Sequence, residues 1–168
     1  MIQRFRQFAL LLCCFSTGIC FAQTAAFDSA TVKQLLGDWK GSLTYLDYKS
    51  GKPYSMPADL KVWQLSDNKL VFSNIYPNEP NANDNDTVTL ANEGRMINNE
   101  VVTSKSILQN GNTEIITEYE GIDGNDQRPA LIRHTYTVGK LTYVVRKDVQ
   151  FKGQVEWVKR NEYSYSRQ

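Results

Sequence analysis

The sequence predicts an all-β domain, an antiparallel up-and-down barrel of eight to ten strands preceded by one short N-terminal helix. Segments in which apolar and polar residues alternate follow one another through most of the chain. Turn-forming residues separate these segments, and Asn-Gly-Asn at 110–112 is the strongest hairpin signal. Sequential hairpins on this scale form a closed barrel or a two-sheet sandwich, and the long final meander favours the barrel.

The N-terminus is typical of a secretory signal peptide. Arg4 and Arg6 precede a short apolar run at 8–15, and small residues lead up to Ala22. We therefore expect residues 1–22 to be removed and Gln23 to begin the mature chain, which places the protein outside the cytoplasm, secreted or periplasmic. An uncleaved N-terminal anchor is the alternative.

Composition narrows the class of protein further. Removing 22 of the 168 residues leaves 146, enough for one barrel domain at 23–168 with a sizeable core. All three cysteines, Cys13, Cys14 and Cys20, lie in the expected signal peptide, so the mature chain has no disulfide. The net charge of +1 argues against nucleic acid or an anionic membrane surface as the main partner.

The elements can be placed in order along the mature chain. Asp28 or Ser29 caps a short helix that ends near Leu36, with Gly37 just past its end. Polar, proline- and glycine-containing loops are expected at 77–86 and 121–129. The expected strands are 38–48, 58–65, 70–76, 87–91, 95–98, 101–108, 113–120, 130–138, 141–149 and 155–166.

A short helix followed by Gly37-Asp38-Trp39 at the start of a meander resembles the lipocalins and their wider calycin relatives, in a bacterial form without the usual disulfide. The resemblance implies that Gly37 and Trp39 close one end of the barrel and that an arginine of the last strand packs on the tryptophan. Arg160 is the expected arginine, and Arg146 is the substitute.

The expected role of Arg160 conflicts with simple alternation along the last strand. If Arg160 points inward, Tyr163 and Tyr165 point outward, which is the poorer choice for burying apolar surface. Either a bulge changes the parity within this strand, or another arginine covers Trp39.

Aromatic and polar side chains on the apolar faces of the strands are the candidate ligand-binding residues. Tyrosine combines ring area with a hydroxyl that can hold a polar group. A single histidine without cysteine does not suit zinc, and we expect no metal and no cofactor, with haem on an axial histidine as the alternative. The candidate residues are Tyr45, Phe72, Tyr76, Tyr119, His134 and Tyr136.

The leading hypothesis is a lipocalin-like protein that binds a small hydrophobic ligand inside the barrel. An alternative is a filled barrel that acts as an accessory protein of the cell envelope through its loops. An enzyme using His134 and Tyr136 ranks third, because no catalytic motif is present. A membrane-spanning barrel is rejected, since the outward positions include Lys40 and Arg133.

Overall fold

The computed structural model describes residues 25–47 and 50–167, so the expected signal peptide lies outside the described residues. None of the helices in these ranges is long and apolar enough to cross a bilayer. The elements are α1 (Ser29–Leu35), β1 (Gly37–Leu46), β2 (Pro53–Pro57), β3 (Asp59–Ser66), β4 (Lys69–Ile75), η1 (Pro80–Ala82), β5 (Asp84–Ala91), η2 (Asn92–Gly94), β6 (Met96–Ile97), β7 (Glu100–Ile107), β8 (Thr113–Asp123), β9 (Arg128–Val138), β10 (Thr142–Phe151) and β11 (Val158–Ser166).

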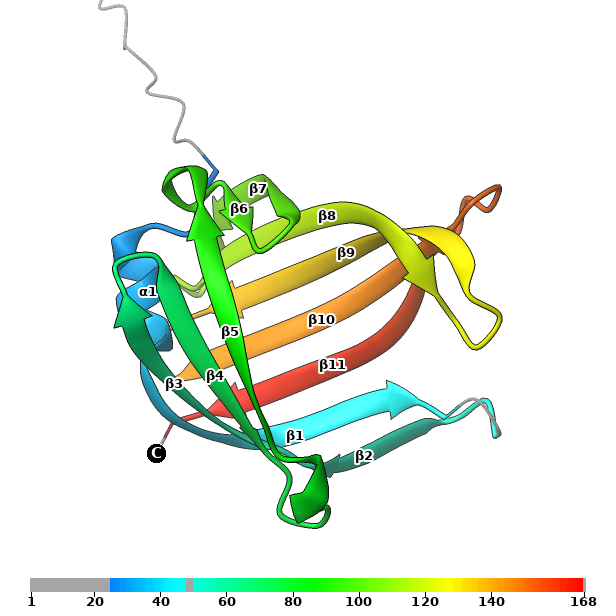
Figure 1. Ribbon diagram of the computed structural model, residues 1–168, viewed down its shortest axis with the longest axis horizontal. Helices are drawn as coiled ribbons and strands as arrows, with labels where there is room; N and C mark the ends of the chain where they lie inside the picture. The colour runs from blue at the N-terminus through cyan, green and yellow to red at the C-terminus, as the bar shows by residue number, and fades with distance from the viewer. Residues whose placement is uncertain (1–24, 48–49, 168) are drawn as a thin grey trace, which may run out of the picture.

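The sheet is antiparallel and closed, as predicted. Strands from β3 to β11 pair with their neighbours in chain order, and β1 pairs with both β3 and β11, which closes the barrel (Figure 1). β2 and β3 follow one another along β1, on either side of Ala58, whose amide bonds the Gly41 carbonyl at 3.0 Å. Because β2 and β3 together occupy one strand position beside β1, the eleven described strand segments form a barrel of ten strands.

Strand also forms in parts of the two expected loops and at 53–57, where no strand was expected. β2 occupies 53–57, β5 begins at residue 84, and the β8–β9 ladder includes 121–123 and 128–129. These residues are polar or contain proline, which is why they resemble turns. Main-chain hydrogen bonds between neighbouring strands form regardless of side-chain polarity, so the ladder extends further than the composition indicates.

The two ends of the barrel differ. At the helix end, where α1 lies, Asp28 caps α1 by accepting a 2.9 Å hydrogen bond from the Thr31 amide. At the loop end, on the opposite side in Figure 1, the β8–β9 and β10–β11 hairpins turn at 124–127 and 152–157. Most of the buried apolar side chains belong to one cluster that includes Leu35 and Trp39, which places the main core toward the helix end.

Trp39 closes the helix end. Its side chain is 2% exposed, and its indole N–H donates a 2.8 Å hydrogen bond to the Leu35 carbonyl of α1. Gly41 lies on the same face of β1, where a β-carbon would meet the Ser164 carbonyl oxygen at 2.2 Å, so no larger residue fits between β1 and β11 there.

The arginine that covers Trp39 is Arg167, and the predicted closure role of Arg160 is wrong. The guanidinium carbon of Arg167 lies 3.9 Å from the centre of the Trp39 ring, and Nη2 donates to the carbonyls of Gln34 at 2.9 Å and Leu36 at 2.5 Å. Arg160 lies near the loop end instead, where its Nε donates to Asp123 at 2.6 Å.

A β-bulge explains why alternation misplaced Arg160. β10 and β11 pair regularly up to Asn161 and resume at Lys159, so Arg160 is an extra residue in β11. On the two sides of the bulge, the alternation of inward- and outward-facing side chains is therefore offset by one residue. The residues on the C-terminal side of the bulge can therefore keep Tyr165, which is 4% exposed, inside the barrel.

Candidate functional site

The barrel contains a cavity of about 230 Å³ that is open to solvent on one side and borders the core at the helix end. Strands from both sides of the barrel contribute to it, together with Phe27 from the segment before α1. The aliphatic part of the lining consists of Leu35, Leu60, Leu70, Val88, Leu90, Ile97 and Val145. An apolar hollow with a few polar groups is the usual form of a small-molecule site.

Stacked tyrosines form the opposite wall of this cavity. Tyr143 and Tyr165 are 5.7 Å apart between ring centres and 15° from parallel, and Tyr165 and Tyr163 are 5.9 Å apart and 12° from parallel. The Tyr163 hydroxyl is 2.9 Å from that of Tyr76, which holds Tyr76 at the end of this row. The row presents ring faces and edges that can pack on a flat apolar molecule.

Burial keeps the hydroxyls of this wall protonated. Loss of contact with water raises the pKa of Tyr143 and Tyr165 well above the usual value. Burial and the hydrogen bond with Tyr76 raise the pKa of Tyr163 in the same direction. These phenols therefore stay neutral at physiological pH and can donate or accept a hydrogen bond.

Glu100 is the less exposed of the two charged side chains among the described residues that line the cavity. It begins β7 after the tight β6–β7 turn, where Asn98 has the positive φ of 52° that asparagine tolerates. Its carboxylate accepts a short hydrogen bond from the Thr117 hydroxyl, and its Oε2 lies 2.9 Å from Nδ1 of His134. Burial, followed by the charge of Glu100, raises the pKa of Tyr136 well above its usual value.

Asp86 is the second carboxylate that lines the cavity. It lies on β5, opposite Phe72 of β4, and its Oδ2 accepts a 3.2 Å hydrogen bond from the Asn74 amide. Asp86 and Asn98 are exposed to solvent, so they mark the rim of the cavity. Among the described residues that line the cavity there is no lysine, arginine or histidine.

The structure brings most of the predicted site residues to this part of the barrel. Phe72 and Tyr136 line the cavity itself. Tyr76 does not line the cavity, but its hydroxyl hydrogen-bonds the hydroxyl of Tyr163, which does. His134 lies behind Glu100, and Tyr119 stacks on His134 with ring centres 6.2 Å apart and 24° from parallel.

Tyr45 is placed elsewhere. Its ring packs on Tyr54 across β1 and β2, with centres 5.5 Å apart, and it lines a separate hollow of about 170 Å³ beside Arg160 and Asn161. Alternation correctly puts Tyr45 on the face of Leu43 and Trp39, but β1 is long enough for Tyr45 to lie beyond the main cavity.

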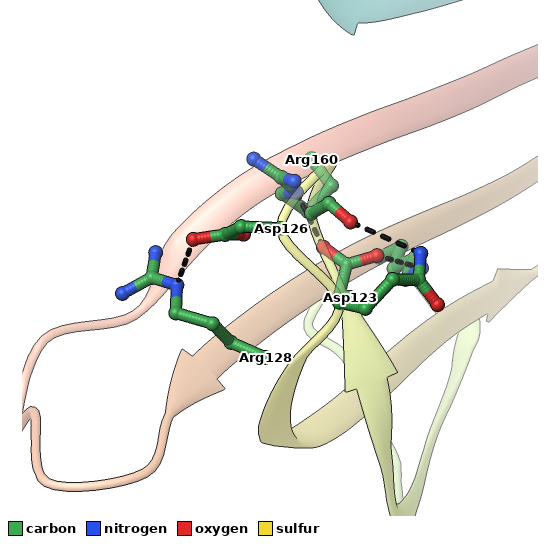
Figure 2. Close-up of polar contacts among 7 residues, drawn as sticks. Asp123, Asp126, Arg128 and Arg160 are labelled. Carbon is green, nitrogen blue, oxygen red and sulfur yellow. Dashed lines mark hydrogen bonds and ion pairs between the residues drawn. The ribbon is translucent and has the colours of Figure 1, made fainter.

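A network of charged side chains occupies the loop end (Figure 2). Asp123 accepts hydrogen bonds from Lys147 at 2.8 Å and from Arg160 at 2.6 Å, and its side chain is 13% exposed. Asp126 and Arg128 form a second, more exposed pair at 2.7 Å in the same region. Arg128 also lies over the Phe151 ring at 3.9 Å, so this network ties the β8–β9 hairpin to β10 and β11.

No group of three or more metal-ligating side chains occurs in the described ranges 25–47 and 50–167. The hydroxyl of Thr117 and the imidazole of His134 both contact Oε2 of the Glu100 carboxylate in the lumen. The arrangement can hold a polar group of a bound molecule by hydrogen bonding and charge.

The sequence analysis missed Glu100, Asp86, Tyr143, Tyr163 and Tyr165 as lining residues. Glu100 lies at the start of its strand in a segment rich in polar residues, where a carboxylate normally faces solvent. The sequence did contain a signal for Tyr163 and Tyr165, because the burial of aromatic surface favours an inward position for both rings. The bulge at Arg160 is what makes that choice possible.

No protein-family model matches this chain, and no curated protein matches it. Among solved structures, the chain is similar to "Crystal Structure of Rv2717c from M. tuberculosis", with a TM-score of 0.48 and 13% identity. The match covers 83% of this chain and 96% of that chain. A likeness this distant carries no argument about ligand or activity.

Proposed function

We propose that this protein is a lipocalin-like barrel that binds a small hydrophobic ligand in its lumen. The observation that carries the proposal is the cavity of about 230 Å³ between an aliphatic wall and a wall of stacked tyrosines. The closure of the helix end by Trp39 and Arg167 supports the lipocalin resemblance. The signal-like residues 1–22 support a secreted or periplasmic location.

The size of the cavity limits the ligand. Its volume of about 230 Å³ exceeds the roughly 150 Å³ in which a protein core holds one benzene molecule. It is below the range of roughly 300 to 1,000 Å³ that is usual for sites of drug-sized molecules. The ligand that fits best is therefore a single ring or a short branched chain with one polar group.

Thermal unfolding with ring-sized probes tests the proposal. Propylbenzene that binds the folded protein alone should raise the melting temperature, with about 2.7 kcal/mol of stabilisation at a hundred times Kd. Val88→Phe fills the cavity and should abolish the shift, because Val88 lines it. Val101→Phe is the matched control on the outer face, where Val101 is 51% exposed, and should leave the shift unchanged.

Tryptophan fluorescence gives an independent reading. Trp63 is 38% exposed, and Trp157 packs on Arg133 at 3.9 Å, so neither reports on the lumen. In a Trp63→Phe, Trp157→Phe double variant only Trp39 remains, 5.8 Å from the ring of Tyr143, which lines the cavity. Probe-dependent emission from this variant supports binding in the lumen. No response across a panel of apolar probes, by either method, favours the filled barrel that acts through its loops.

The proposed location has its own test. The mass of the protein recovered from the periplasm or the culture medium should correspond to a chain that begins at Gln23. Recovery of the full-length chain from the membrane fraction would contradict cleavage and support an N-terminal anchor.

A further inference from the structure

We infer that the cavity selects ligands whose polar end is a cation or a hydrogen-bond donor, and that it discriminates against carboxylates. This inference rests on the proposed function, since it concerns the ligand of the same cavity. It begins from the charges of the lining. Both charged side chains among the described lining residues, Glu100 and Asp86, are acidic.

The position of Glu100 makes its charge the dominant one. Its side chain is 12% exposed, so water screens its field less than that of a surface carboxylate. An anionic group brought beside it would be repelled by Glu100 and again by Asp86 at the rim. A cationic group would be attracted by both, and attraction between opposite charges in a water-poor lumen exceeds that on the surface.

Glu100 has room for a further hydrogen bond. Thr117 and His134 both approach Oε2. A carboxylate offers about four lone-pair positions and donates nothing when ionised. An ammonium or hydroxyl group on the ligand can take a remaining position, whereas a carboxylate on the ligand has no proton to offer.

Lys147 and Arg160 are engaged away from the cavity, whereas His134 contacts Glu100 directly, with Nδ1 at 2.9 Å from Oε2. Lys147 lies opposite His134 in the β9–β10 ladder, but its Nζ is 2.8 Å from Asp123 at the loop end. Arg160 binds the same carboxylate at 2.6 Å. Neither lines the cavity, so neither compensates the charge that a ligand meets there.

The walls determine the other end of the ligand. The row of rings that includes Tyr143 and Tyr165 on one side and leucine and valine side chains on the other give the cavity apolar walls. A planar ring suits this space because aromatic rings pack on each other by offset stacking or edge-to-face contact. The ligand class is therefore a small aromatic amine or alcohol with its polar end at Glu100.

The decisive experiment compares four probes of similar shape by calorimetry on the wild-type protein: phenethylamine, phenethyl alcohol, propylbenzene and hydrocinnamate. Phenethylamine should bind at least about tenfold more tightly than propylbenzene, because a hydrogen bond to a charged group contributes roughly 1.5 to 3 kcal/mol. Phenethyl alcohol should fall between them, and hydrocinnamate should bind most weakly.

Glu100→Gln keeps the size of the side chain and removes its charge. It should weaken phenethylamine about tenfold and leave propylbenzene unchanged. Glu118→Gln is the matched control, since Glu118 pairs with Arg133 at 2.6 Å and does not line the cavity. Circular dichroism verifies that both variants are folded, and the wild-type probe series is decisive even if Glu100→Gln does not fold.

Each outcome has a distinct meaning. If none of the four probes binds, the proposed function is overturned and the inference with it. If propylbenzene binds but hydrocinnamate binds as tightly as phenethylamine, the cavity is a ligand site and only the inference on charge is overturned. If folded Glu100→Gln retains the preference for the amine, Glu100 is not the group that selects it.

Discussion

The two ends of the barrel both place an arginine on an aromatic ring, but they hold that arginine differently. At the helix end Arg167 lies 3.9 Å over Trp39 and donates to main-chain carbonyls of Gln34 and Leu36. At the loop end Arg128 lies 3.9 Å over Phe151 and pairs with the Asp126 carboxylate.

The comparison shows two ways of closing a barrel. The helix end is closed by a buried indole, and its arginine satisfies neutral carbonyls at the end of α1, where cations interact favourably. The loop end is held by charges, with the Asp123 carboxylate between Lys147 and Arg160. Substitutions should therefore cost stability through lost packing at the helix end and through unpaired charge at the loop end.

The largest expected effect is that of Trp39→Ala at the helix end. Removing a side chain that is 2% exposed leaves a cavity beside Tyr143, and such truncations cost about 4 kcal/mol of unfolding free energy. Urea denaturation measures the change. Trp63→Ala, at a position that is 38% exposed, is the matched control and should cost far less. Equal losses in the two variants would mean that Trp39 does not close the barrel.

At the loop end, Asp123→Asn should have the next largest effect. It removes the charge that pairs with two largely buried cations, Lys147 and Arg160, whose side chains are 22% and 9% exposed. Breaking such a network should cost about 3 kcal/mol. Asp126→Asn breaks the exposed pair with Arg128 and should cost only about 0.5 kcal/mol. Both values come from chemical denaturation, and similar losses would contradict the distinction drawn between the two pairs in Figure 2.

Arg167→Ala tests whether hydrogen bonds to uncharged main-chain carbonyls stabilise the helix end. The variant loses the contact with the Trp39 ring and the hydrogen bonds to α1, which together should contribute about 2 kcal/mol. Because its partners are carbonyls, the loss should depend little on salt, in contrast to the loss in Asp123→Asn. Thermal unfolding at low and high salt measures this. Arg95→Ala, which breaks an exposed pair with Glu93, is the control and should have almost no effect.

The smallest expected effect is a pH dependence at the helix end. Burial raises the pKa of Asp28, but hydrogen bonds from Lys105 and from Thr31 outweigh it and lower the pKa from the usual 3.8 to about 2. The ionised carboxylate therefore contributes stability that is fully present above pH 3.8 and is lost as the pH falls through about 2.

Asp28→Ala measures that contribution. Asp28 itself is 45% exposed, so solvent screening reduces its contribution, but its partner Lys105 is only 7% exposed and is left unpaired, so the variant should lose about 1 to 2 kcal/mol at neutral pH. The difference from the wild type should shrink between pH 4 and pH 2, as measured by denaturation across that interval. Asp28→Ser, which retains a capping side chain but not the pair with Lys105, should lie between the two. A difference that stays constant down to pH 2 would contradict the assigned role of the charge.

Most of the fold was predictable because it depends on local patterns. Alternation placed Trp39 and Tyr136 on inward faces, Asp28 was a recognisable cap, and the turn at 110–112 separates β7 from β8 as expected. Strand ends were less predictable, since the β8–β9 ladder continues to Asp123 through residues that also suit turns.

The site was predictable only in part. The expected Phe72 and Tyr136 line the cavity, whereas Tyr45 lies beyond it and Glu100 was not anticipated. Glu100 and His134 are 34 residues apart, and nothing in either local sequence indicates that they meet. Their contact results from the order in which β7, β8 and β9 lie side by side.

By itself, the sequence determined the all-β class, the short helix and the tryptophan that faces inward at the start of the first strand. These features follow from periodicity and turn chemistry, which act over a few residues. Only the tertiary structure decided that Arg167 covers Trp39, that Arg160 forms a bulge beside Asp123, and that a hollow remains next to Glu100. The register between distant strands determines which side chains meet, and a single extra residue reverses the facing of all that follow it.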